Sequence, residues 1–135
     1  MRRFCNGIIA AGIAVFTVGT LAAQTKSASA AVKNPVASTP KSIATGEAVF
    51  QKYCRHCHGA DARGDGPQAP KDTHPANLTD DKWDHGSTDA EIFVVIKDGV
   101  GPKYDMKGLN SKLTPKEMWS VVNYLRSLSP KNSTR

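Results

Sequence analysis

Cysteine, aromatic residues and stretches of alternating polarity are all scarce in this chain. Only 3 of the 135 residues are cysteine and 7% are aromatic, which excludes a network of structural disulfides and a large aromatic core. No stretch alternates apolar and polar residues as a half-buried strand does, and no segment is repeated. The chain is long enough for one small domain, and these absences favour a domain made of helices.

Positive charge is in modest excess, and part of it lies at the N-terminus. The chain has 18 lysines and arginines, 12 aspartates and glutamates, and a formal net charge of +6. Without Arg2, Arg3 and Lys26, the basic residues fall to 15 and the net charge falls to +3. The sequence contains no arginine-rich stripe or interleaved aromatic run, so nucleic acid is not an expected partner.

The first 30 residues have the pattern of a secretory signal peptide. Arg2 and Arg3 precede a run from Gly7 to Ala23 that is apolar or small apart from two threonines. We predict cleavage after Ala23 or after Ala30, which places the mature protein in the periplasm or otherwise outside the cytoplasm. The alternative is an uncleaved membrane anchor, for which the run is short compared with the ~20 residues of a membrane span.

The rest of the chain divides into a leader, a domain and a tail. Residues 31–43 are rich in Ala, Ser, Thr, Lys and Pro, and we predict a flexible leader there. The folded domain is expected over residues 44–129, and residues 130–135 form a polar tail. Within the domain, residues 59–86 are rich in Gly, Pro, Asp and Asn, which predicts a long loop.

Three helices are predicted inside the domain. Thr45 is the expected N-cap of the first. The other two begin at capping boxes, Thr88-Asp89-Ala90-Glu91 and Thr114-Pro115-Lys116-Glu117, and their apolar residues recur at three-to-four spacing. The predicted helical stretches, caps included, are 45–53, 88–98 and 114–128, which makes the fold class all-α.

The segment Cys54-Arg55-His56-Cys57-His58 has the C-x-x-C-H spacing that attaches a c-type haem. Two thiols separated by two residues can add across the two vinyl groups of the porphyrin, and the next residue places an imidazole under the iron. The motif therefore predicts one covalent haem c, attached through Cys54 and Cys57, with His58 as the proximal iron ligand.

A C-x-x-C pair also occurs in redox dithiols and in zinc sites. A thioredoxin-like dithiol requires a βαβ context, and the sequence shows no strand of that kind. A zinc site usually has a second ligand pair at short spacing. Here His56 with His58 is a crowded pair, and His74 and His85 lack finger-like spacing. Haem attachment is the favoured interpretation, and zinc binding and dithiol chemistry are the alternatives.

The ligand on the other face of the iron decides between electron transfer and other haem chemistry. Met106 is expected in a loop where no apolar periodicity requires a methionine, so we predict that it is the second axial ligand. His74 and His85 are alternative ligands, whereas Met118 fits the apolar face of the last helix and is expected in the core. An open or labile sixth position would instead indicate a haem peroxidase or a gas-binding protein.

Together these motifs resemble the class I, single-haem c-type cytochromes, in the subset that contains Gly-Asp-Gly-Pro. The resemblance extends over about residues 45–128 and implies a small cytochrome c fold, with three main helices and long loops wrapped around the haem. It also implies that the first and last helices cross. The residues that carry the resemblance are Gly46, Phe50, Cys54, Cys57, His58, Gly59, Gly64-Asp65-Gly66-Pro67, Pro75-Ala76-Asn77-Leu78, Met106 and Val121-Val122-Asn123-Tyr124-Leu125.

The same resemblance implies how the haem is held and what it does. In this family a proline carbonyl orients the proximal imidazole; Pro67 matches that position best, with Pro70 as the alternative. The ligand methionine is usually followed by proline, whereas Lys107 follows Met106 here. The implied function is electron transfer between Fe(II) and Fe(III) without a small-molecule substrate, by a free shuttle or by a subunit of an exported respiratory or dehydrogenase chain.

Redox proteins are the expected partners, and they would bind a monomer weakly and transiently over a small interface. A cationic rim near the haem edge would steer an acidic partner to it. The lysines predicted for this rim are Lys52, Lys71, Lys103, Lys107 and Lys112.

Overall fold

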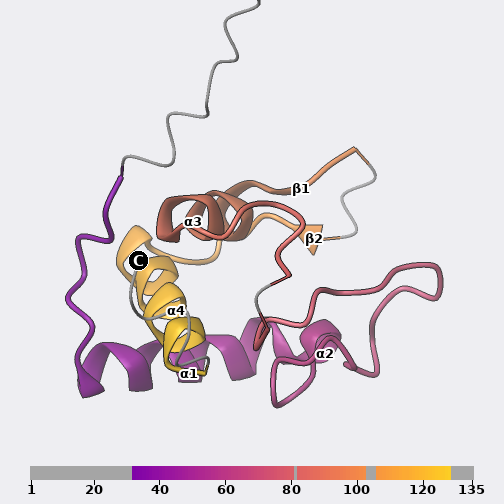
Figure 1. Cartoon of the computed structure of the whole chain (residues 1–135), viewed down its shortest axis with the longest axis horizontal. Helices are drawn as coiled ribbons and strands as arrows, with labels where there is room; N and C mark the ends of the chain where they lie inside the picture. The colour runs from indigo at the N-terminus through magenta and orange to yellow at the C-terminus, as the bar shows by residue number, and fades with distance from the viewer. Residues whose placement is uncertain (1–31, 81, 103–105, 129–135) are drawn as a thin grey trace, which may run out of the picture.

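A computed structural model describes residues 32–80, 82–102 and 106–128 of the chain. The predicted signal peptide and the polar tail lie outside these residues. Within the described part, no helix combines the length and the apolar character needed to cross a bilayer. Figure 1 shows the elements in chain order: α1 (Pro40–Tyr53), α2 (Arg55–His58), α3 (Asp89–Asp98), β1 (Gly99–Val100), β2 (Met106–Lys107) and α4 (Pro115–Leu128).

The first helix begins six residues earlier than its predicted cap implies. Thr39 is the N-cap: its hydroxyl accepts from the backbone N–H of Ser42 at 3.2 Å, and the Ser42 hydroxyl accepts from the N–H of Thr39 at 3.0 Å. Pro40 follows at the first helical position. Thr45 lies inside the helix and donates its hydroxyl to the carbonyl of Lys41. The prediction for Thr45 was wrong because serine replaces the glutamate or glutamine of the usual capping box.

The segment before α1 packs on α4, which corrects much of the predicted flexible leader. The Asn34 side-chain amide donates to the Trp119 carbonyl at 3.2 Å and to the Asn123 amide oxygen at 2.8 Å. The Asn123 amide nitrogen in turn lies 3.1 Å from both the Val36 carbonyl and the Ser42 hydroxyl. Because Asn123 is almost completely buried, these hydrogen bonds satisfy a polar group that would otherwise be costly.

The helices α1 and α4 cross, as the family resemblance implied, and the crossing forms the centre of the core (Figure 1). A Cβ atom at Gly46 would overlap the backbone carbonyl of Ser120, so only glycine lets the two backbones approach this closely. Next to it, the rings of Phe50 and Tyr124 lie with centroids 5.4 Å apart. Phe50 is 0% exposed and Val121 is 1% exposed. Burial of each such side chain contributes about 1.5–3 kcal/mol to the stability of the fold.

The other two long helices begin where their capping boxes predict, and these predictions are confirmed. Glu91 Oε2 accepts from the N–H and the hydroxyl of Thr88, at 2.9 and 2.8 Å. Glu117 Oε2 accepts from the same two groups of Thr114, at 2.8 and 2.7 Å. Helix α3 also ends as predicted, at Asp98 before a glycine.

Two short elements were not predicted. The strands β1 and β2 pair in antiparallel fashion, with Gly99 opposite Lys107 and Val100 opposite Met106. Two residues per strand are too few to show an alternating pattern. The single helical turn α2 was also missed, because it consists of the haem motif itself. The pairing places Met106 in a strand rather than in a free loop.

Candidate functional site

The haem motif lies at the end of α1, where α2 brings its three key side chains together. Cys54 is both the C-cap of α1 and the N-cap of α2. Its carbonyl accepts from the backbone N–H groups of Cys57 and His58, at 3.1 and 3.0 Å. Residues three and four apart share one side of a helix, so the two thiols and the imidazole point toward the same space.

That space is a cavity of about 410 Å³, which we call the haem cavity. The two predicted attachment cysteines and both predicted axial ligands line it. Cys54, Cys57 and His58 line it from α2, and Met106 lines it from β2. A mostly apolar cavity with a few polar groups suits a flat, largely apolar cofactor. Among the apolar side chains of its wall are Phe50, Ile92, Ile96, Leu109, Val121 and Leu125. The residues present therefore fit a covalently attached haem.

The His58 ring is oriented by a backbone carbonyl, but not by the one predicted. Its Nδ1 lies 3.1 Å from the carbonyl oxygen of Ala76. A carbonyl can only accept, so Nδ1 carries the proton and Nε2 keeps its lone pair for iron. Burial lowers the pKa of His58 below its usual 6.5, and the hydrogen bond to Ala76 opposes that shift. Both the tautomer and the neutral form are those that a metal ligand requires.

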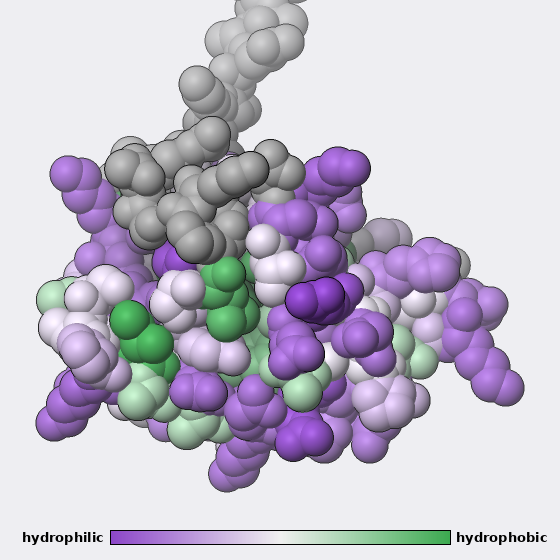
Figure 2. Space-filling model, turned by 60° about the horizontal axis from the view of Figure 1, so that its bottom comes forward, coloured by the Kyte–Doolittle hydropathy of each residue, from purple (hydrophilic) through white to green (hydrophobic). Residues whose placement is uncertain are grey.

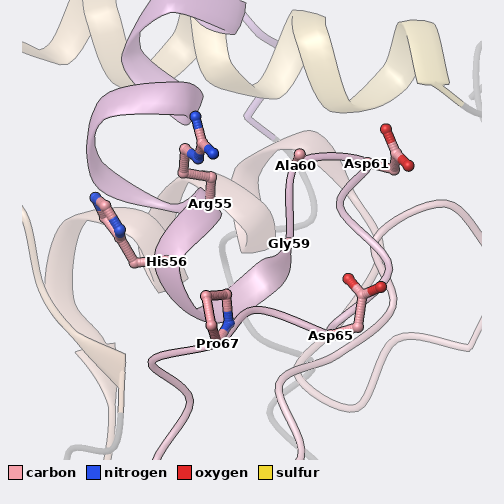
Figure 3. A pocket seen from close by; sticks show the side chains of 7 residues that line it. All are labelled: Arg55, His56, Gly59, Ala60, Asp61, Asp65 and Pro67. Atoms are coloured by element: carbon pink, nitrogen blue, oxygen red, sulfur yellow. The ribbon is translucent and has the colours of Figure 1, made fainter.

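The prediction for Pro67 is corrected by this contact. Pro67 lines a different pocket, of about 300 Å³, next to α2. Figure 3 shows Arg55 and His56 on one side of that pocket and Asp61 and Asp65 on the other. Pro70, the alternative, does line the haem cavity, but Ala76 holds the ring. The resemblance had included the Pro75–Leu78 segment without assigning it this role.

The Cys54 thiol is buried, and its surroundings do not favour the reactive thiolate of a dithiol. Burial, and secondarily the nearby Cys57, raise its pKa to about 12. Reactive dithiols require a lowered pKa. A neutral S–H group, in contrast, supplies both atoms that add across a vinyl double bond. Among the residues that the structure describes, no three or more His, Cys, Asp or Glu side chains form a group suited to a metal ion.

The structure also shows where the other methionine and histidine side chains considered as ligands lie. Met118 is 2% exposed and packs in the core, as expected. His74 and His85 are exposed but also line the haem cavity. His74 lies two residues before Ala76, which holds His58, and therefore near the proximal side. His56 is exposed and outside the haem cavity.

Comparison with known proteins agrees with the geometry. The profile of the family described as cytochrome C oxidase, cbb3-type, subunit III, matches residues 41–125. The chain belongs to this family. The match spans α1 to α4 and includes the four predicted haem-binding residues. This c-type cytochrome domain therefore carries covalently attached haem c, and its function is haem-based electron transfer.

Two relatives are named as oxidase subunits. The cbb3-type cytochrome c oxidase subunit CcoP of Rubrivivax gelatinosus is 39% identical over 95 residues, which cover 70% of this chain and 28% of that protein. Subunit FixP of Sinorhizobium medicae (strain WSM419) is 33% identical over 94 residues, covering 64% of this chain and 30% of that protein. This chain thus spans less than a third of the length of these relatives.

Solved structures of other cytochromes share the fold. The reducing HAO-like protein complex Kustc0457/Kustc0458 of Kuenenia stuttgartiensis matches with a TM-score of 0.64 and 25% identity, over 73% of this chain and 49% of that one. Cytochrome cL of Methylophaga aminisulfidivorans matches with a TM-score of 0.54 and 26% identity, over 65% and 53% of the two chains. The small cytochrome c fold predicted from the sequence is confirmed.

Proposed function

We propose that this cytochrome domain is an exported electron carrier whose iron is bound axially by His58 and Met106. When bound, haem c supplies a one-electron change between Fe(II) and Fe(III). The observation that carries the proposal is that a neutral imidazole, with Nε2 available, and the Met106 thioether line the same cavity. A thioether ligand favours the reduced iron and raises the potential relative to a second histidine.

The protein contributes attachment, orientation and exclusion of water. Cys54 and Cys57 would hold the haem at two points, and the Ala76 carbonyl orients the His58 ring. The buried apolar side chains of the cavity wall, such as Phe50, Val121 and Leu125, would keep water from part of the haem. Because a rigid site with two strong ligands changes little on oxidation, this arrangement suits electron transfer better than substrate turnover.

A redox protein is the proposed partner, in keeping with the oxidase subunits among the relatives. Lys107 lines the haem cavity, and Lys52, Lys71 and Lys112 are exposed. The fifth lysine of the predicted rim lies outside the described residues. The face in Figure 2 is mainly hydrophilic with small hydrophobic areas between, which favours weak docking of a monomer over a permanent apolar contact. The predicted signal peptide supports a periplasmic location.

Replacement of the methionine tests the proposal. We expect the wild-type protein, matured with haem, to show sharp low-spin bands and the weak near-infrared sulfur-to-iron band. Met106→Ala should lose that near-infrared band and let the ferrous iron bind carbon monoxide. Met118→Leu is the matched control, because Met118 is buried in the core and does not line the haem cavity. Ready binding of carbon monoxide by the wild-type protein would contradict the proposal and favour a peroxidase or a gas-binding protein.

A further inference from the structure

Arg126 lies behind one wall of the haem cavity and contacts the segment that forms it. It is in the last turn of α4, and its side chain is only 11% exposed. Its Nε donates to Asp89 Oδ1 at 2.7 Å, and its Nη2 donates to the carbonyl of Ser87. The Cζ atom lies 6.0 Å from the centre of the Trp83 ring. One guanidinium therefore joins the end of α4 to three positions in residues 83–89.

The residues that Arg126 holds lead directly into the cavity. Trp83 and the three residues after it line the cavity, and we call residues 83–86 the tryptophan wall. The Trp83 indole N–H donates to the Asp80 carbonyl at 2.8 Å, so the polar end of the side chain is satisfied. The wall has no helix or strand of its own, so side-chain contacts such as those to Arg126 help to fix its position.

A guanidinium suits this place better than an ammonium group of the same charge. It is planar and presents its donors in fixed directions, so it binds a carboxylate and a carbonyl at once while it faces an aromatic ring. A lysine at this position keeps the charge but cannot reproduce the fork. The effect of Arg126 on the wall can therefore be separated from the effect of its charge.

We propose that Arg126 is a positioning residue that holds Trp83 and the rest of the tryptophan wall closed over the haem cavity, and thereby raises the reduction potential. The inference deepens the proposed function and depends on it. Solvent exposure and the surrounding hydrogen bonds set the potential of a bound haem. Water stabilises the more highly charged oxidised iron, so an opened wall lowers the potential.

The test uses the haem-loaded protein and the variants Arg126→Gln and Arg126→Lys. Two quantities are measured: the midpoint potential, and hydrogen exchange of the backbone amides of residues 82–88. We expect both variants to have a lower potential and exchange faster by on the order of tenfold in this segment. Lys97→Gln is the charge control, since it removes a cation from a pair with Asp98 that is 46% and 49% exposed. This control should retain the wild-type potential and exchange.

A double variant tests whether Arg126 acts through the indole. In a Trp83→Leu background, Arg126→Lys should change the potential by less than half of its effect in the wild type. An undiminished effect of Arg126→Lys on the potential of the double variant would overturn the proposal. A single Arg126→Lys variant with wild-type potential and exchange would also overturn it, because it would show that only the charge of Arg126 matters. If Arg126→Gln does not fold, Asp89→Ala removes the acceptor of the same pair from α3 and is expected to reproduce the faster exchange; unchanged exchange would refute the inference. Failure of the proposed function itself would differ, as a wild-type protein without a low-spin c-type spectrum.

Discussion

The two sides of the haem cavity are built from different kinds of structure. On one side, His58 stands on α2 at the end of α1, which is locked across α4 (Figure 1). Two backbone hydrogen bonds to Cys54 form its turn, and the Ala76 carbonyl holds its ring. On the other side, Met106 stands in a strand of two residues whose partner is equally short. The two proposed axial ligands therefore differ in how firmly the protein holds them.

If both residues bind the iron as proposed, this difference predicts which of them is displaced more easily. Displacing His58 would require α2 to unwind and the hydrogen bond between the His58 ring and the Ala76 carbonyl to break. The covalent attachment of the haem to Cys54 and Cys57 opposes such a movement. Displacing Met106 requires that the pairing of β1 with β2 opens, and a pair of two-residue strands that is only half-buried opens at low free energy. We therefore expect that a substitution that weakens the domain first frees the methionine side, while the histidine side stays intact until the domain unfolds.

The largest effect is expected at the helix crossing that supports the histidine side. Gly46→Val would force its side chain against the Ser120 carbonyl and Tyr124 Cβ, and we expect a loss of about 3 kcal/mol of unfolding free energy. Chemical unfolding of the haem-loaded protein measures this loss. Ala48→Val, at an exposed position of the same helix, controls for the low helix propensity of valine and should cost well under 1 kcal/mol. Equal losses in the two variants would show that the crossing is not tight.

What the sequence revealed depends on how far apart the interacting residues lie. Cys54, Cys57 and His58 act within five consecutive residues, so their spacing alone identified the chemistry. The caps at Thr88 and Thr114 are equally local, and both were predicted at the right residue. Patterns of this kind are visible because each hydrogen bond closes within one helical turn.

Two of the features that escaped prediction join distant parts of the chain. The Ala76 carbonyl contacts a ring 18 residues earlier, and Asn34 contacts a side chain 89 residues later. Neither contact leaves a periodic or spacing signal, because each depends on the path of a loop over the folded core. The role of Pro67 was assigned by resemblance alone, and the observed loop path gives that role to Ala76.

A smaller effect, confined to the methionine side, is expected from Gly99→Ala. Gly99 has φ of 80°, and a Cβ atom there would meet the Met106 carbonyl and lie 2.6 Å from the Gly108 nitrogen. The strained conformation costs about 1–3 kcal/mol, enough to open the short strand pair. We expect the sulfur-to-iron band to weaken and carbon monoxide to bind while the haem stays attached.

Asp98→Ala is the neighbouring control for this experiment. It removes only an exposed ion pair with Lys97, which contributes little to stability, so its near-infrared band should match the wild type. Loss of the band in both variants would mean that any change at the end of α3 disturbs Met106. A Gly99→Ala protein with a normal band would refute the idea that the strand pair holds the ligand.

The smallest expected effect is the pH dependence of the cap of α3. Hydrogen bonds from the Thr88 backbone and then its hydroxyl lower the pKa of Glu91 below its ordinary 4.5. A carboxylate with a lowered pKa stabilises the folded state above 4.5, and this contribution disappears as the pH falls through the lowered value. Glu91→Ala should therefore cost about 0.5–1 kcal/mol at neutral pH, and the difference from the wild type should shrink under acid. Unfolding by denaturant between pH 7 and pH 3 measures this, with Glu47→Ala, at an exposed position of α1, as the control. A difference that stays constant over this pH range would mean that Glu91 stabilises α3 without its charge, through packing against Gly86.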